Sequence, residues 1–146
     1  MHGLRQHREF ALHDTLAEQA ETYLQKIFDG QYRAVYDTMA ANYPELYPRE
    51  VTFEQWRSRT HHALYAAGDY YGKSVQRVVV QHPEEEEKDS PIRGLVVCRF
   101  VFTEGGSDLN FFFHFVDGQW ELIAVRPQIA IPVFPDDEDE PKERFE

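Results

Sequence analysis

Asp117-Gly118, which separates two runs of mostly aromatic and aliphatic residues, constrains the fold of this chain more than any other feature. A tight type I′ turn requires positive φ at both of its central residues, and an Asp-Gly pair meets that requirement at little steric cost. The turn places Val116 opposite Gln119 and Phe115 opposite Trp120. Counting outward from it, we expect two strands whose aromatic side chains share one face.

A second turn is expected at Gly105-Gly106, because glycine adopts positive φ without steric cost. This turn pairs Phe100 with Phe111, so that the inward face continues without a break from one hairpin into the next. The inward set comprises Val96, Cys98, Phe100, Phe102, Leu109, Phe111, Phe113, Phe115, Trp120, Leu122 and Ala124. The reverse face, which includes Val125, mixes polar and apolar residues. There we expect a protein interface formed by Val97, Arg99, Phe112, His114, Glu121 and Ile123.

Two amphipathic helices are expected near the start of the chain. The first begins at Asp14 or Thr15, which are suitable N-caps, and it ends at Gly30. The second covers the periodic apolar positions from Tyr32 to Ala40. It stops before a loop that contains Pro44 and Pro48.

A third helix has the clearest start signal, since Thr52 and Gln55 have the spacing of a capping box. It is expected to end at Gly68. Residues 74–81 are rich in β-branched side chains and form the first strand. The resulting fold class is α+β, with three N-terminal helices packed on a curved four-stranded antiparallel sheet.

The length of 146 residues suits one domain, which buries roughly 70% of the surface of its unfolded chain. We divide the chain into a flexible head (1–13), a body (14–126) and a proline-rich, acidic tail (127–146). Three prolines exclude a central strand in the tail, although its apolar residues can still dock on the body.

The net charge of −11 comes mainly from two short segments. Residues 84–89 and 136–146 hold 12 of the 26 acidic residues but only 3 of the 15 basic ones. The acidic segments are either solvated faces or binding elements for a basic protein partner. No cluster of Lys and Arg forms the stripe that phosphate contacts require, so binding of nucleic acid is not expected.

Cys98 is the single cysteine, which excludes a disulfide or a thiolate metal site within one chain. We expect no metal and no cofactor. The N-terminal residues lack the apolar run of a signal peptide, and no later segment approaches the length of a membrane span. The expected localisation is cytoplasmic, with no membrane partner.

Four segments in this order resemble the nuclear-transport-factor-2-like superfamily, the fold of ketosteroid isomerase and scytalone dehydratase, and in particular its small bacterial members of unknown function. The segments are FDGQY (28–32), VTFEQWRSR (51–59), AAGDYYGKSVQRV (66–78) and DGQWELIAV (117–125). The resemblance implies a cone-like fold, with a pocket between the concave face of the sheet and the helices, and often a homodimer through the convex face. It does not imply one activity, because the superfamily contains enzymes, adaptors and binding modules.

The expected pocket is mostly apolar. Its lining candidates are Tyr23, Tyr36, Trp56, Tyr70, Tyr71, Phe100, Phe113 and Trp120, with His61 and Asp69 at its mouth. General acid–base catalysis needs a titratable group inside such a pocket. The last three strands place neither a carboxylate nor an imidazole on their inward face. We therefore assign no catalytic residue and favour a non-enzymatic role.

Three groups of polar residues each allow more than one interpretation of their role. His61-His62 suggests metal binding or proton transfer, but neighbouring helix residues point about 100° apart, and two exposed side chains are the simpler interpretation. Asp69 beside two tyrosines either binds a polar ligand group or makes a turn. His114 and Glu121, with Arg99, either complement a homodimer face or a covering tail, or form a pH-sensitive pair.

Three hypotheses for function follow. The first is a non-catalytic domain, homodimeric through its sheet, that binds a small apolar ligand or a protein. The second is a small isomerase or dehydratase that uses His61, Asp69, Tyr70 or Tyr71 as acid or base. The third is an inhibitor or immunity-type protein whose acidic segments bind a basic partner.

Overall fold

The computed structural model describes residues 2–65, 70–87, 89–102, 105–127 and 134–135; side chains are described from residue 11 onward, except at 70–76, 101, 102 and 105. The helices are α1 (His2–Phe28), α2 (Tyr32–Asn42) and α3 (Phe53–Tyr65). The strands are β1 (Tyr70–Gln81), β2 (Ile92–Phe102), β3 (Gly105–Val116) and β4 (Gln119–Pro127), with a short 3-10 helix at Glu85–Glu87. Within the described ranges, no helix is long and apolar enough to cross a membrane.

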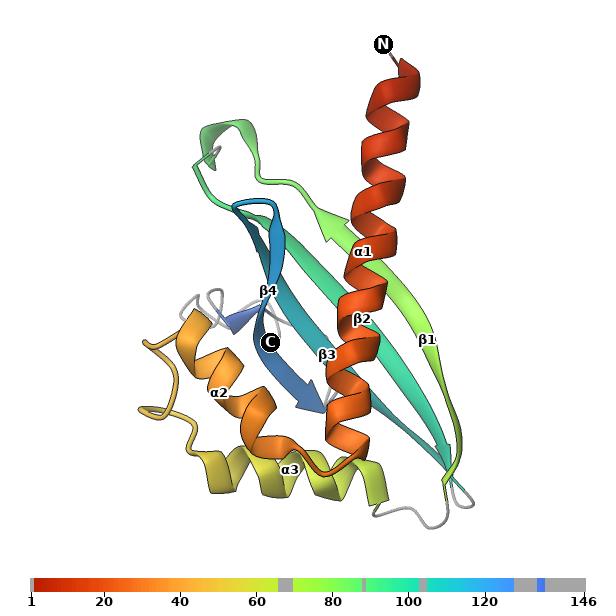
Figure 1. The fold of residues 1–146 in the computed structure, drawn as a ribbon, viewed down its shortest axis with the longest axis vertical. Helices are drawn as coiled ribbons and strands as arrows, with labels where there is room; N and C mark the ends of the chain where they lie inside the picture. Colours follow the sequence, from red (N-terminus) through yellow and green to blue (C-terminus); the bar gives the residue numbers. More distant parts are fainter. Residues whose placement is uncertain (1, 66–69, 88, 103–104, 128–133, 136–146) are drawn as a thin grey trace, which may run out of the picture.

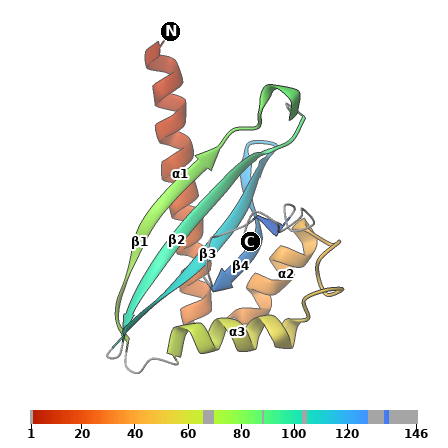
Figure 2. The ribbon, with the colours of Figure 1, turned by 180° about the vertical axis from the view of Figure 1, so that it is seen from behind.

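The four strands pair in chain order, each antiparallel to the next. The helices lie on one side of this curved sheet: α1 runs along it, while α2 and α3 lie near β4 (Figure 1). The view from behind shows the opposite, convex side of the same sheet (Figure 2). The expected α+β class, with three helices packed on a four-stranded antiparallel sheet, is confirmed.

Helix α1 is longer than the sequence suggested. It begins at His2, so the predicted start at Asp14 or Thr15 is wrong, and residues 2–13 are helical. Thr15 does not cap the helix; its hydroxyl donates to the Ala11 carbonyl oxygen (2.9 Å) one turn earlier. The far end is as predicted, because Gly30 adopts φ of +79° and ends the helix.

The capping box at the start of α3 is confirmed. The Thr52 amide donates to Gln55 Oε1 (3.0 Å), and the Gln55 amide donates to Thr52 Oγ1 (3.2 Å). These two bonds satisfy amide groups that the first turn of a helix leaves without a partner. The predicted end of the helix at Gly68 lies outside the described residues.

The hairpin between β3 and β4 has the predicted turn and, next to it, the predicted register. Asp117 and Gly118 both have positive φ, and His114 faces Glu121. Beyond Phe113 the strands shift by one residue, because Phe112 faces Ala124. Counting outward from the turn without a bulge would pair Phe111 with Ala124 and Phe112 with Ile123, and this β-bulge on β4 makes both expected pairs wrong. The bulge also reverses the sides to which two residues point. Val125 packs in the core on the concave face, and Ala124 packs on the convex face, each opposite to its predicted side.

The hairpin between β2 and β3 keeps its predicted faces but not its predicted register. Phe111 pairs with Val96 instead of Phe100, because the hairpin closes between Phe102 and Gly105 and not at Gly105-Gly106. The displacement is an even number of residues. Since side chains alternate with a period of two, the inward set is unchanged. The pattern of the sequence determined which face is buried, but not which residues pair.

The main core lies between the helices and the concave face of the sheet. Phe100, Phe111 and Phe113 are fully buried there, and Cys98 is buried with them as expected. The ring of Phe28 on α1 meets Phe100 edge to face at 5.6 Å. The inward aromatic face of the strands is thus a packed core, which positions α1 against the sheet.

Gly94, in β2, is a point of close approach between α1 and the sheet. A Cβ atom added there would lie 2.7 Å from Leu16 and 2.9 Å from the Trp120 ring. Contacts this short force side chains or backbone to move. The absence of a side chain at position 94 therefore sets the distance between α1 and the sheet.

We predict that Gly94→Ala lowers the free energy of unfolding by about 1–3 kcal/mol, as overpacking of a core does. Chemical denaturation measures the change. In a double-mutant cycle, Leu16→Ala removes one of the two obstructing side chains, and Gly94→Ala should then cost less. An equal cost in both backgrounds would show that Leu16 does not limit the space at position 94.

The convex face carries a second apolar cluster that is also covered. Leu95, Val97, Phe112, Ile123 and Ala124 form it, and Tyr43 and Phe134 pack against it. The Phe134 ring meets Phe112 at 5.1 Å, and the Arg93 guanidinium lies 4.8 Å from the centre of the same ring. At Phe134, the tail therefore docks on the reverse side of the sheet.

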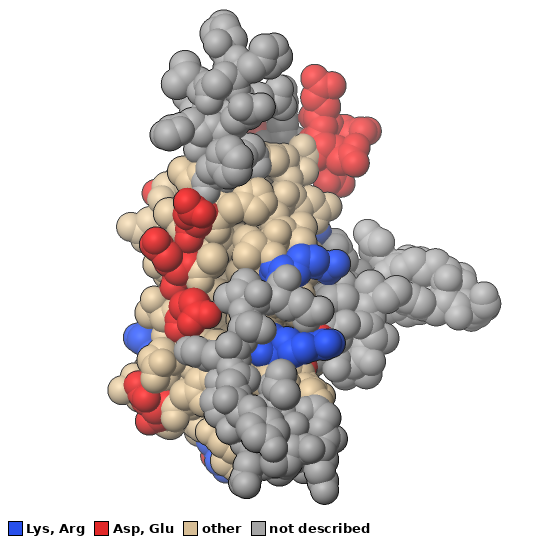
Figure 3. All heavy atoms as spheres, turned by 90° about the vertical axis from the view of Figure 1, so that its right-hand side faces the viewer, with Lys and Arg blue, Asp and Glu red and all other residues tan. Residues whose placement is uncertain are grey.

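In the view of Figure 3, one group of acidic side chains gathers at the upper right edge, and the other charged residues are spread over the body. Described Asp and Glu side chains lie along the body, and the Lys and Arg side chains visible there stand apart from one another. Several of the described charges form local pairs on the surface, such as Arg33 with Asp37 at 3.2 Å. Exposed pairs of this kind contribute little to stability.

Candidate functional site

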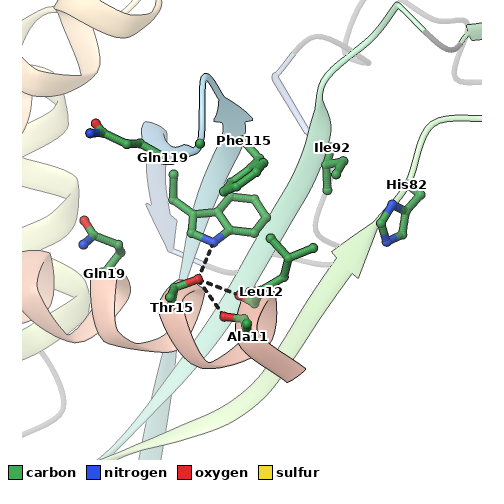
Figure 4. Close-up of a pocket in the computed structure, with 10 residues that line it drawn as sticks. Ala11, Leu12, Thr15, Gln19, His82, Ile92, Phe115 and Gln119 are labelled. Carbon is green, nitrogen blue, oxygen red and sulfur yellow. Dashed lines mark hydrogen bonds between the residues drawn. The ribbon is translucent and has the colours of Figure 1, made fainter. Parts of the chain in front are cut away.

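A cavity of about 1060 Å³ lies between α1 and the end of the sheet where β3 turns into β4. Helix α1 forms one wall, and the opposite wall comes from the sheet (Figure 4). The described lining residues are Ala11, Leu12, Thr15, Gln19, His82, Ile92, Phe115, Gly118, Gln119 and Trp120. We call this space the α1 cavity. Its volume is at the upper end of the range for small-molecule sites.

The indole of Trp120 stands at the centre of the α1 cavity wall and is held from several sides. Its Nε1 donates a hydrogen bond to Thr15 Oγ1 on α1 (3.1 Å). Its ring lies 4.9 Å from that of Phe115 and 6.4 Å from that of Phe113. The hydrogen bond joins α1 directly to β4, so the two walls of the cavity keep a fixed spacing at this point.

The lining of the α1 cavity is apolar in the middle and polar at its two ends. In Figure 4, Leu12 and Phe115 lie next to the indole and Ile92 lies between it and His82, while Gln19 and Gln119 lie toward the opposite end. Among its described lining residues there is no Asp, Glu, Lys or Arg. Such a site offers hydrogen bonds to a ligand without offering it an opposite charge.

Of the eight predicted pocket residues, some lie in the core, some line a cavity, and two have side chains outside the described set. Trp120 lines the α1 cavity, whereas Phe100 and Phe113 are buried in the core with no exposed surface. Tyr36 is also buried, and its hydroxyl donates to the Val51 carbonyl oxygen (2.8 Å). Tyr23 is half-buried, with its ring 6.2 Å from that of Phe113. The side chains of Tyr70 and Tyr71 lie outside the described set.

Trp56, the last of the predicted pocket residues, lines a different cavity. This second space, of about 800 Å³, lies between the α2–α3 loop, α3 and the end of β4. We call it the α3 cavity. Trp120 and Trp56 are the two tryptophans of the chain, so each cavity has one indole in its wall.

The two adjacent histidines occupy different surroundings. His61 is exposed, with its ring 4.7 Å from that of Tyr65 and its Nδ1 3.3 Å from Tyr32 Oη, and it is not part of either cavity's described lining. Burial raises the pKa of Tyr32, with a further upward contribution from Tyr65. His62 lines the α3 cavity. Asp69, the other predicted pocket-mouth residue, lies outside the described residues.

No described residues form a metal centre. Within those ranges, no group of three His, Cys, Asp or Glu side chains is placed to hold an ion. His61 and His62 belong to no such group.

The residues expected at a sheet interface are partly covered by the chain itself. Val97, Phe112 and Ile123 are buried in the convex cluster. Arg99 is exposed and forms a bidentate ion pair with Asp108, in which Nε lies 2.9 Å from Oδ1 and Nη2 lies 3.3 Å from Oδ2. The Asp108 carboxylate raises the pKa of Arg99 through these hydrogen bonds and its charge. His114 and Glu121 face each other across β3 and β4, both half-buried.

The contribution of α1 to the α1 cavity was not predicted from the sequence. Leu12 was absent from the predicted lining because the helix was expected to start after it, at Asp14 or Thr15. Thr15 and Gln19 fall within the predicted helix, but as polar residues they were not assigned to an apolar pocket. One signal for a longer helix was present. The spacing of four residues from Leu12 to Leu16 continues to Ala20, which is the repeat of a single helical face.

Geometry alone carries the functional interpretation of these cavities. Comparison of the chain with models of known families, with curated proteins and with solved structures gives no match. The α1 cavity combines the larger volume, an apolar wall and a few hydrogen-bonding groups. It is therefore the leading candidate for a binding site.

We predict that Thr15→Val lowers the free energy of unfolding by about 1–2 kcal/mol, because it leaves the Trp120 indole N–H without its acceptor. The valine keeps the volume of the side chain. Thr15→Ser keeps the hydroxyl and serves as the control, which should retain most of the stability. Denaturant titration measures both variants. If valine and serine have the same effect, the hydrogen bond does not contribute to the junction between α1 and β4.

Proposed function

We propose that this chain is a non-catalytic binding domain that holds a small, uncharged, mostly apolar molecule in the α1 cavity. The observation that carries the proposal is a large cavity whose described lining contains aromatic and aliphatic side chains, two primary amides, a hydroxyl and an imidazole, and no Asp, Glu, Lys or Arg. Binding sites for small molecules commonly combine an apolar surface with a few polar groups that fix orientation. Gln19 and Gln119 supply such groups at one end.

The same lining argues against general acid–base catalysis in this cavity. An acid or base must lie within hydrogen-bond reach of the reacting atom, and a carboxylate or imidazole usually fills that role. His82 is the one such residue in the described lining, and it lies at the opposite end from the two amides (Figure 4). His61, which the isomerase hypothesis uses, is exposed and outside this lining.

We further propose that the domain belongs to the nuclear-transport-factor-2-like superfamily. Three helices followed by a curved antiparallel sheet in the order β1-β2-β3-β4, with the helices on one face, support this proposal. Fold alone does not carry an activity, because unrelated functions occur on one architecture. The proposed ligand therefore rests on the lining of the cavity and not on the family.

The binding proposal is tested with N-phenyl-1-naphthylamine, an uncharged apolar dye whose emission rises in an apolar site. We predict binding by the full chain and a loss of affinity of about tenfold or more, equivalent to ~1.4 kcal/mol or more, in Ala11→Phe. Ala11 is exposed on α1 and lines the cavity, so a phenylalanine there fills space that the dye needs.

Ala34→Phe is the matched control for this test. Ala34 is also an exposed helical alanine, on α2, and does not line the cavity, so this variant adds the same aromatic ring elsewhere. It should bind the dye as the unmodified chain does. Equal binding by all three proteins would show that the dye does not occupy the α1 cavity.

Homodimerisation through the convex face stays a prediction, and Phe134 is central to its test. In one chain this ring packs on Phe112, which is 1% exposed. A dimer through that surface requires Phe134 to move or to join the interface. We expect Phe134→Ala to uncover apolar surface and to strengthen self-association. Light scattering measures the molar mass; if both proteins are monomers at tens of micromolar, the predicted homodimer is excluded.

A further inference from the structure

We propose that the α3 cavity is a second binding site, which takes a singly charged anion with an apolar body, such as a carboxylate or sulfonate attached to a ring or chain. This inference is independent of the ligand of the α1 cavity. It rests on an apolar floor, on two arginines and a histidine at the same space, and on a volume of about 800 Å³.

The floor of the α3 cavity is apolar and is fixed by hydrogen bonds to β4. Trp56 is 4% exposed, and its Nε1 donates to the Val125 carbonyl oxygen (3.0 Å). Tyr47 is equally buried, and its hydroxyl donates to the Ile123 carbonyl oxygen (3.0 Å). Because both polar atoms are already bound to backbone, the rings present apolar surface toward the cavity. A preformed apolar floor suits a hydrophobic ligand body.

One face of α3 brings positive charge to this floor. Arg59, His62 and Ala63 all line the cavity, and their spacing of three and four residues places them on the same side of the helix. Arg59 is exposed and forms no ion pair with another described residue. Its neighbour Arg57, by contrast, pairs with Glu54 at 3.4 Å. Arg59 therefore lines the cavity with a guanidinium that no described carboxylate pairs with.

The balance of charge at the α3 cavity favours an anion. Arg126 on β4 adds a second guanidinium, and Glu50 is the one acidic residue of the described lining. A guanidinium offers paired N–H donors that match the oxygens of a carboxylate or sulfonate. Glu50 disfavours a head group with several negative charges. A free inorganic anion would make no contact with the apolar floor, and an uncharged molecule would offer the Arg59 guanidinium no oxygen of opposite charge.

The test uses 8-anilinonaphthalene-1-sulfonate, which has the skeleton of N-phenyl-1-naphthylamine with a sulfonate added. We expect the full chain to bind it, and Arg59→Ala to weaken that binding about five- to tenfold, as loss of a charge-assisted hydrogen bond does. Arg57→Ala removes the same charge from the same helix outside the cavity, and should change the affinity by less than about twofold. Added salt should weaken binding of the sulfonate more than binding of the uncharged dye.

A second variant, Ala63→Phe, fills the cavity without changing its charge. It should abolish binding of the sulfonate and leave binding of the uncharged dye intact. If circular dichroism shows that this variant does not fold, the exposed Arg59→Ala decides the question alone.

The inference is overturned if Arg59→Ala binds the sulfonate as the unmodified chain does, or if Arg57→Ala weakens that binding equally. It is also overturned if Ala11→Phe abolishes binding of the sulfonate, because the probe then occupies the α1 cavity. Failure of the uncharged dye to bind would reject the proposed function and leave this inference standing.

Discussion

Three side chains from the helical half of the molecule bind the open edge of β4, and the α3 cavity depends on that attachment. The bonds run from Asn42 Nδ2 to the Leu122 oxygen (2.9 Å), from Tyr47 Oη to the Ile123 oxygen (3.0 Å) and from Trp56 Nε1 to the Val125 oxygen (3.0 Å). An edge strand exposes unpaired carbonyl groups, which these donors satisfy. In a regular strand, neighbouring carbonyls point to opposite edges, so acceptance by both Leu122 and Ile123 fits the bulge at this position. The attachment fixes α2, the loop after it and α3 against β4.

The two ends of the concave face of the sheet therefore carry cavities with different lining residues. At the end next to the α2–α3 loop, Trp56 is bound to β4 and forms the floor of the α3 cavity, with arginines around it. At the other end, Trp120 is bound to Thr15 on α1 and forms the wall of an uncharged cavity. The aromatic core between these ends is closed, because its phenylalanine rings are fully buried. Binding capacity is thus placed at the two ends of the core, where helix and sheet separate, and the chemistry of each end selects a different class of molecule.

Features that depend on neighbours in the sequence were predictable. Thr52 and Gln55 form their capping box, and Asp117-Gly118 forms its turn, because each requires only residues a few positions apart. The alternation of apolar residues also identified the buried face of the strands. It could not determine the register between β2 and β3, because an even displacement buries the same side chains. The bulge at Ile123 and the two cavities result from contacts between distant segments. The helical region before Asp14 was missed because a suitable N-cap residue inside a helix looks the same in the sequence as one at its start.

The most direct test of the central claim, that an uncharged apolar molecule binds between α1 and β4, is nuclear magnetic resonance of the ¹⁵N-labelled chain titrated with N-phenyl-1-naphthylamine. The two indole N–H groups of the chain give separate signals, one for each cavity. The proposal predicts that the Trp120 signal moves, together with amide signals from residues 11–19 of α1 and from the turn before β4, while the Trp56 signal stays in place. Movement of the Trp56 signal alone, or no movement of either indole signal at saturating dye, would contradict it.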